Sequence, residues 1–335
     1  MKIGEINTRD KILIIAEIGN NHEGSYSLAE EMIGLAAQSG ADAVKFQTII
    51  PEKLVSIQQT ERINQLRRFQ LSYEQFVKLS KFANQEGVIF LSTPFDIESA
   101  LFLNELVPVF KIASGDNDFY PLIQKIASTG KPIIMSTGLT SIDELETTTQ
   151  FIKNIWQKNH IEQELALLQC VSTYPTPKED ANLSAINVLK QIADIVGYSD
   201  HTLGIEASVL SVAFGARIIE KHFTIDNSFS DFHDHKLSSN PSDFKKMVDQ
   251  IRDAEKMIGV GKKVPSDLEK KSKQNIRRSI VANHNLSVGH KIILEDLDWV
   301  RPGCGVRPGN EDKLIGKKLN RAIKAGEMIE LKNLD

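Results

Sequence analysis

Eight short apolar segments constrain the fold of this chain more than any other feature of its sequence. Each of them stops at polar or glycine residues; in chain order they are ILIIAEIG, DAVKFQ, VIFLSTPF, VFKIASGD, PIIMSTG, LALLQCVSTYP, DIVGYSD and RIIEKHF. Segments of this length that are apolar nearly throughout are typical of β-strands buried on both faces, as in parallel sheets. The sequence therefore predicts eight buried strands.

Most of these segments are separated by stretches with helical periodicity. SYSLAEEMIGLAAQSGA and SIDELETTTQFIKNIWQ, for example, carry apolar residues at three- and four-residue spacing and begin with a serine placed to cap the helix. An eightfold alternation of strand and helix predicts an α/β fold of the TIM-barrel, (β/α)8 type. The alternative, an open doubly wound sheet, requires a glycine-rich phosphate turn after the first strand, where this chain has the polar EIGNNHEGS.

The alternation stops near residue 258, so we expect residues 1–258 to form the barrel. The lysine-rich, polar residues 259–278 are interpreted as a linker or a solvated helix. Residues 279–335 contain an internal repeat, because SVGHKIILEDLD aligns without a gap with KAGEMIELKNLD. This repeat predicts a small pseudo-symmetric module with turns at its glycines, which is too small to be stable without packing against something.

The composition excludes several classes of partner. With 40 Lys and Arg against 44 Asp and Glu, there is no basic field to attract nucleic acid or an anionic membrane, which favours a small polar substrate. Cys170 and Cys304 are too few and too far apart for a disulfide framework or a zinc knuckle, so we expect free thiols. No apolar segment has the length of a signal peptide or a membrane span, and we expect a cytoplasmic protein.

Polar side chains follow every one of the predicted strands. Since barrel enzymes carry their chemistry at the C-terminal ends of the strands, we expect these residues to form one site. In chain order they are Glu17, Asn20, Asn21 and His22; Lys45 and Gln47; Thr93, with Phe95 beside it; Lys111, Ser114 and Asp116; Ser136 and Thr137; Ser172 and Tyr174; Ser199, Asp200 and His201; and Glu220, Lys221 and His222.

Two of these residues, Lys45 and Lys111, are lysines within apolar segments. Because burying an ammonium without an anion is costly, each predicts an anion-binding or catalytic role, with a structural ion pair as the alternative. Ser114, Ser136 and Ser199 either cap the helices that follow or, together with the lysines and the helix N-termini, form a cradle for a phosphate or carboxylate.

His201 and His222 end the seventh and eighth predicted strands, which are neighbours in a closed barrel. Their imidazoles could share one divalent ion that acts as a Lewis acid on a carbonyl; the alternative is that they hydrogen-bond substrate or backbone. A rival cluster, DFHDH at 231–235, offers His233, His235 and two aspartates, but it falls in a predicted loop and could instead serve as a substrate lid.

The chain resembles the bacterial sialic acid synthases, a family that includes the legionaminic and pseudaminic acid synthases. The motifs that carry the resemblance are AEIGNNHEG, DAVKFQT, FLSTPFD, KIASGD, IIMSTG, STYPTP, GYSDHT and IEKHFT, in this order. The C-terminal RRSIVA, WVRPG and glycine repeat are similar to the antifreeze-like (SAF) domain of the same proteins, which has a β-clip fold. The resemblance covers almost the whole chain.

This resemblance implies a transferase that condenses phosphoenolpyruvate with an N-acetylated hexosamine and water, giving a nine-carbon 2-keto acid and phosphate. We expect N-acetylmannosamine as the acceptor and N-acetylneuraminate as the product. The alternative within the family is a legionaminic or pseudaminic acid synthase that uses a 2,4-diacetamido-trideoxyhexose. A divalent metal is implied, with Mn²⁺ expected and Mg²⁺ or Co²⁺ as alternatives.

The resemblance also implies roles for single residues. His201 and His222 would bind the metal, and Glu17 would be the acid/base beside the metal-bound water or aldehyde. Phosphoenolpyruvate would be held by Lys45, Lys111, Ser114, Ser136 and Ser199. The sugar site and other substrate contacts would involve Gln47, Thr93, Phe95, Asp116, Ser172, Tyr174 and Asp234. Arg301, counted with Glu17 and the two lysines as catalytic, would reach the N-acetyl group from a partner subunit, which implies a domain-swapped homodimer.

The chain departs from the family pattern at three places. Asp116 stands where glutamate is usual, Ser172 stands where asparagine is common, and the loop SFSDFHDHKLS differs from the usual glycine-proline-aspartate form. All three changes concern substrate contacts, so they leave the acceptor sugar open. Two readings outside the family remain: a Schiff-base aldolase, which would use pyruvate without a metal, and a non-catalytic carbohydrate-binding protein.

Overall fold

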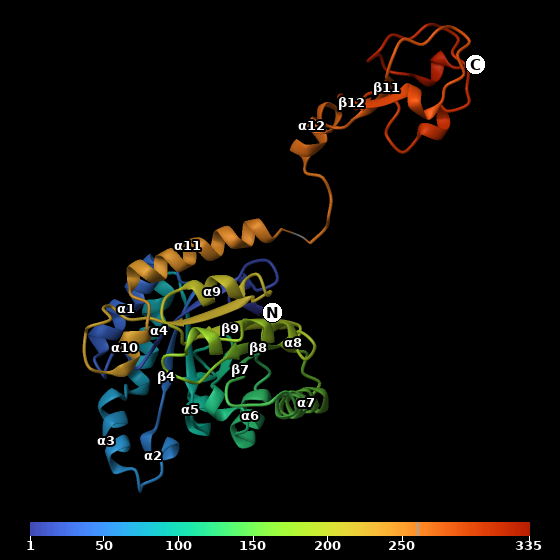
Figure 1. Cartoon of the computed structure of the whole chain (residues 1–335). Coiled ribbons are helices and arrows are strands. Elements are labelled where there is room, and N and C mark those ends of the chain that lie inside the picture. The colour runs from blue at the N-terminus through green and yellow to red at the C-terminus, as the bar shows by residue number, and fades with distance from the viewer. Residues whose placement is uncertain (260) are drawn as a thin grey trace. The chain divides into compact units, whose positions relative to one another are not determined.

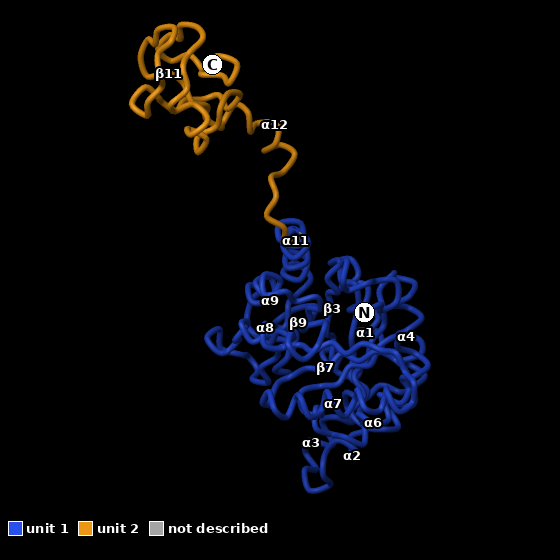
Figure 2. The backbone as a smooth tube through the Cα atoms, turned by 90° about the vertical axis from the view of Figure 1, so that its right-hand side faces the viewer, with its two compact units in different colours: residues 1–259 blue, residues 260–335 orange. Residues whose placement is uncertain are grey.

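The computed structural model describes residues 1–259 and 261–335, and the chain divides into two compact units, residues 1–259 and 260–335 (Figure 2). Each unit contains an apolar core of its own. Among the helices in the described ranges, none combines the length and the apolar character that crossing a membrane requires.

Eight parallel strands form a nearly closed barrel in the first unit (Figure 1). Their bounds are β3 Leu13–Gly19, β4 Ala43–Thr48, β5 Ile89–Pro94, β6 Phe110–Ile112, β7 Ile133–Ser136, β8 Leu165–Cys170, β9 Ile195–Asp200 and β10 Ile218–His222. Hydrogen-bonded ladders join them in the order β5-β4-β3-β10-β9-β8-β7-β6, and β5 lies beside β6 where the ring closes. This order confirms the predicted (β/α)8 barrel and excludes the open doubly wound sheet.

Most helices of this unit follow a strand and pack on the outside of the barrel, while α2 and α3 project from it (Figure 1). The helices are α1 Tyr26–Gln38, α2 Pro51–Leu54, α3 Thr60–Phe69, α4 Tyr73–Gln85, α5 Ile97–Leu103, α6 Tyr120–Ala127, α7 Ile142–Lys158, α8 Ile186–Leu189, α9 Glu206–Ser211, α10 His233–Leu237 and α11 Pro241–Ile258. The serines predicted to cap two of them do so: Ser25 accepts from the backbone N–H of Leu28, and Ser141 accepts from that of Glu144. Each satisfies a donor that the first turn leaves unpaired.

The interior of the barrel is apolar toward the N-terminal ends of its strands. Leu13, Ile15 and Ile218 belong to a buried cluster there, and Met1 and Ile3 from the N-terminal hairpin pack into it. The hairpin consists of β1 Lys2–Ile3 and β2 Ile6–Asn7. Since this end is filled by apolar side chains, any internal site must lie at the opposite end, where the strands terminate.

Alternation along the strands determines which polar residues face that end. Side chains two positions apart share one face of a strand, so Glu17 follows Leu13 and Ile15 on the inner face of β3. By the same rule the interior receives Lys45 and Gln47 from β4, Thr93 from β5, Lys111 from β6, Ser136 from β7, Cys170 from β8, Ser199 from β9, and Glu220 and His222 from β10. These buried strands end in polar residues because their ends line one internal site.

The second unit is a small module of short elements. It contains α12 Asp267–Ile276 and an antiparallel pair, β11 Ser279–Ala282 with β12 Leu297–Val300. The two copies of the sequence repeat have the same local structure at paired positions. Gly289 and Gly326 have φ of +77° and +78°, and Ile292 and Ile329 are both fully buried. Helix α12 falls within residues 259–278 and has no buried residue.

Candidate active site

Lys45 lies at the centre of an ion-pair cluster contributed by neighbouring strands. Its Nζ is 2.7 Å from Oε2 of Glu17 and 3.6 Å from Oε1 of Glu220, and it donates a 3.0 Å hydrogen bond to Oγ1 of Thr93. All four side chains are buried. The structure therefore shows Lys45 in the ion-pair arrangement that the sequence left open, with its charge compensated from within the chain.

The electrostatics of this cluster favour proton exchange at Glu17. Burial raises the pKa of Glu17 to about 7, with Lys45 opposing the rise and Glu220 adding to it. Burial alone would lower the pKa of Lys45, but the two carboxylates outweigh burial and raise it. The Nε2 of Gln47 donates to Oε1 of Glu17 at 3.2 Å and orients the carboxylate. A carboxyl group with a pKa near neutrality can act as an acid or a base at physiological pH.

Lys111 differs from Lys45 because, among the described residues, it makes no ion pair. Its Nζ donates to Oγ of Ser136 at 2.7 Å and to the backbone carbonyl of Ile112 at 3.1 Å. Burial lowers the pKa of Lys111. A buried amine whose contacts are all neutral groups is well suited to receive an anion from outside the chain.

Glu220 connects the two lysines electrostatically. Burial would raise its pKa, but Lys111 and Lys45 outweigh burial and lower it. Oγ of Ser199 donates to Oε1 of Glu220 at 3.2 Å, while Oε2 is buried without a hydrogen-bond partner in the described part of the chain. Sequence reasoning placed Glu220 at a strand end but assigned it no role. Its position two residues before His222, on the same face of β10, was the signal that could have identified it.

The two predicted metal ligands lie close together. The ring centroids of His201 and His222 are 5.4 Å apart, and the ring of Tyr174 lies 4.1 Å from the first and 6.0 Å from the second. Nδ1 of His201 lies 2.8 Å from the carbonyl oxygen of Val171, a contact that orients the ring. Nδ1 of His222 is buried without a hydrogen-bond partner among the described residues.

This pair fits a divalent ion. Burial lowers the pKa of His222 well below its usual range, which keeps the imidazole in the neutral form that binds metals. Burial alone would also lower the pKa of His201, but contact with Cys170 outweighs burial and raises it, so an ion would compete with a proton at His201. Within residues 1–259 and 261–335 no three His, Cys, Asp or Glu side chains are grouped as a metal site, so water or substrate oxygens would complete the coordination of His201 and His222.

Ser114, Ser172 and Cys170 gather around Gly138, next to the histidines. Ser114 Oγ donates to Cys170 Sγ at 3.4 Å and accepts from the N–H of Gly138 at 3.1 Å. A Cβ at Gly138 would lie only 2.4 Å from Ser172 Oγ and 2.8 Å from Ser114 Oγ, so any larger residue would displace one or both hydroxyls. Cys170 Sγ lies 3.8 Å from Nδ1 of His201. Cys170 was expected only as a free thiol, and alternation along β8 could have placed it in the interior.

The other predicted residues lie around this centre or in the second unit. Asp116 ends a 3-10 turn after β6, and burial raises its pKa to about 6. Phe95 follows β5 and is half-buried, whereas Asp234 is buried within α10. Arg301 is exposed and belongs to the second unit.

Two families match the chain, one in each part. Residues 32–263 match the NeuB family, and residues 277–335 match the SAF domain. The first match covers more than half of the chain, and the second covers the C-terminal module that the sequence set apart.

Known relatives match over nearly the full length. An uncharacterised protein of Methanocaldococcus jannaschii is 44% identical over 97% of this chain and 94% of its own length. The N,N'-diacetyllegionaminic acid synthase of Legionella pneumophila is 40% identical over 93% and 92%. The crystal structure of N-acetylneuraminic acid (sialic acid) synthetase from Leptospira borgpetersenii, determined with citrate, is 35% identical, covers 81% of this chain and 94% of its own, and superposes with a TM-score of 0.75. The chain therefore belongs to the NeuB family and carries a SAF domain at its C-terminal end.

Proposed function

We propose that this protein is a transferase that condenses phosphoenolpyruvate with an N-acetylated hexosamine and water to form a nonulosonic acid and phosphate. The observation that carries the proposal is Lys111, a buried amine with only neutral partners at the carboxyl end of a barrel in a NeuB-family chain. An anionic substrate would supply the direct ion pair that Lys111 lacks among the described residues.

Phosphoenolpyruvate would bind between the two lysines. Lys111 and Ser136 offer one set of donors, and Ser114 and Ser199 offer hydroxyls from the neighbouring strand ends. Lys45 is already paired with Glu17 and Glu220, so its ammonium would donate a hydrogen bond to the substrate without depending on the substrate for its only partner. In this arrangement C3 of phosphoenolpyruvate would be held facing the sugar aldehyde.

His201 and His222 would hold a divalent ion, which we propose to be Mn²⁺, with Mg²⁺ or Co²⁺ as alternatives. When bound, the ion would supply Lewis acidity at the aldehyde oxygen of the open-chain sugar. Tyr174 lies against both imidazole rings and would limit the space beside them.

Glu17 would provide the proton transfer that the condensation requires. C3 of phosphoenolpyruvate forms a bond to the aldehyde carbon, and the aldehyde oxygen becomes a hydroxyl by taking up a proton. Water adds at C2, and the resulting tetrahedral species loses phosphate to leave the 2-keto acid. A carboxyl group with a pKa of about 7 can give a proton in the first step and regain one from the attacking water in the second.

The acceptor that we propose is N-acetylmannosamine, which would give N-acetylneuraminate. A 2,4-diacetamido-trideoxyhexose is the second candidate, and the 40% identity to the Legionella legionaminic acid synthase favours it. Asp116 and Ser172 stand at positions where a changed side chain would alter contacts with the acceptor. Groups of this size differ by about 1–3 kcal/mol in an apolar pocket, and by more where a buried hydrogen bond is lost.

The decisive experiment measures phosphate release from phosphoenolpyruvate with Mn²⁺ and each of three sugars: N-acetylmannosamine, 2,4-diacetamido-trideoxymannose and 2,4-diacetamido-trideoxyaltrose. We expect release that requires one sugar and disappears with a chelator and in His222→Ala. No release with any of the three sugars would contradict the proposal. Borohydride trapping of a pyruvate adduct would instead support the Schiff-base aldolase.

A further inference from the structure

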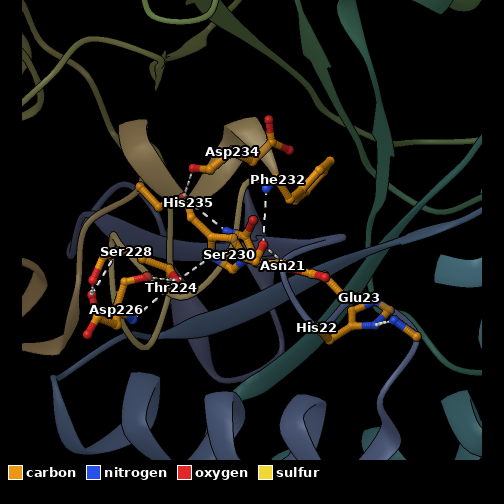
Figure 3. Close-up of polar contacts among 12 residues, drawn as sticks. Asn21, His22, Glu23, Thr224, Asp226, Ser228, Ser230, Phe232, Asp234 and His235 are labelled. Carbon is orange, nitrogen blue, oxygen red and sulfur yellow. Dashed lines mark hydrogen bonds and ion pairs between the residues drawn. The ribbon is translucent and has the colours of Figure 1, made fainter. Parts of the chain in front are cut away.

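His235 belongs to the 231–235 cluster that the sequence offered as a rival metal site, but its ring is occupied by other contacts (Figure 3). Its side chain is fully buried. Nε2 lies 3.0 Å from Oε1 of Glu23, to which it donates, and Nδ1 lies 2.7 Å from Oγ1 of Thr224. With both ring nitrogens engaged, His235 has no lone pair left for a metal. Its contacts instead join the segment after β10 to the turn after β3.

Glu23, the partner of His235, belongs to a turn with a constrained backbone. It has φ of +47°, a conformation that side chains other than glycine rarely adopt. Gly24 follows with φ of +83°, and a Cβ there would lie 2.0 Å from the carbonyl oxygen of Arg68. The Glu23 carboxylate also accepts a hydrogen bond from Ser230 Oγ. Held in this way, Glu23 presents a fixed acceptor to two residues of the facing segment.

The segment that carries His235 is fastened at further points. Nδ2 of Asn227 donates to the backbone carbonyls of His235 at 2.8 Å and of Ser238 at 2.6 Å. Nδ2 of Asn21, from the turn after β3, donates to Oγ of Ser238 at 2.9 Å. The ring of Phe232 packs edge-on against Phe69, with centroids 4.9 Å apart. These contacts anchor the segment to the turn after β3 and to α3.

This anchoring fixes the backbone position of Asp234. This residue immediately precedes His235 in α10 and is buried, and its carbonyl accepts a 2.6 Å hydrogen bond from Ser238 Oγ. Its carboxylate lies 3.1 Å from Nε2 of the exposed His233. Burial raises the pKa of Asp234. A side chain of this kind can select among sugar hydroxyls only if its backbone is held in place.

We propose that Glu23 and His235, together called the latch, are positioning residues that hold Asp234 and thereby set the affinity for the acceptor sugar. The inference rests on the proposed function and deepens it, because it names a determinant of sugar binding that does not contact phosphoenolpyruvate. Glu23 lies in the turn after β3 and His235 lies in α10 next to Asp234, and their contact joins these two segments (Figure 3). Loss of a supporting contact of this kind typically costs 10–100-fold in the function of the residue that it orients.

The test compares Glu23→Ala, His235→Ala and the double variant with Glu31→Ala, a matched control at an exposed glutamate of α1. The latch predicts that KM for the sugar rises about 10- to 100-fold in each latch variant, whereas KM for phosphoenolpyruvate stays within about threefold. The double variant should lose less than the sum of the two single losses, since both single variants remove the shared Glu23–His235 contact. Glu23→Gln retains an acceptor oxygen and should recover most of the sugar affinity.

A second readout does not depend on turnover. Amide hydrogen exchange of residues 228–238 in the full-length protein should be faster in both alanine variants than in the Glu31→Ala control. Unchanged exchange, or a KM for both substrates that rises together, would overturn the latch. If the wild-type protein released no phosphate with any sugar, the proposed function would fail by itself, and the exchange rates alone would then decide whether the latch holds the loop.

Discussion

At the scale of single residues, two of the buried lysines of the barrel, Lys45 and Lys111, predict effects of different size on stability. Lys45→Met leaves Glu17 and Glu220 without their shared cation, and breaking a buried pair costs about 3–5 kcal/mol. Lys111→Met removes a charge that makes no ion pair but that stabilises the ionised form of Glu220, so we expect a smaller loss of stability, while turnover should collapse in both variants. Urea unfolding followed by Trp156 fluorescence in a Trp299→Phe background reports on the barrel alone. Equal destabilisation by the two substitutions would contradict this assignment.

Asp116 provides a prediction about pH at the same scale. Burial raises its pKa from 3.8 to about 6, so the folded barrel favours the protonated acid. The ionised form therefore costs stability, a cost that is absent below pH 4, grows between pH 4 and pH 6, and is complete above. Asp116→Asn should raise the barrel's unfolding midpoint at pH 7.5 but not at pH 4. A gain of the same size at both pH values would show that the effect is not due to ionisation.

At the scale of elements, β9 and β10 are tied together directly behind the histidine pair. Lys221 Nζ lies 3.1 Å from Oδ2 of Asp200, both side chains are fully buried, and Ser208 Oγ donates to the same carboxylate at 2.6 Å. Lys221→Met should cost about 3–5 kcal/mol by leaving Asp200 unpaired, and adding Asp200→Asn should recover much of that loss. A double-mutant cycle from urea unfolding measures the coupling. Additive losses would mean that the two charges act independently.

At the same scale, the sequence predicted the strands and helices but not the contacts between distant ones. Apolar runs and serine caps predicted the strands and helices because they reflect local burial and local hydrogen bonds, as at Ser141. The charged centre was predicted as a set of residues, but the pairing of Lys45 with Glu220 was not, since it requires β4 and β10 to flank β3. Glu23 lies in the turn after β3 and His235 in α10, near opposite ends of the barrel sequence, and no periodicity links such segments. Their contact is apparent only when the barrel closes.

At the scale of the whole molecule, the stability of the small second unit requires an explanation. Its core is built from short elements around Ile280 and Leu297, which is little apolar volume for an independent domain. We propose that it docks on a second copy of the chain, where Arg301 would reach the sugar's N-acetyl group. This proposal requires a homodimer in which each site draws on both subunits.

Complementation between two inactive variants tests that requirement. Lys111→Met damages the barrel site and Arg301→Ala damages the second unit, so neither homodimer should turn over. If Arg301 acts in trans, each hybrid dimer has one complete site, in which an intact barrel meets the intact Arg301 of the other subunit. With equal co-expression about half of the dimers are hybrids, so about a quarter of wild-type activity should return. If Arg301 acts within its own chain, no site in the hybrid has both residues. Activity that stays at the level of the separate variants would therefore exclude the swapped arrangement.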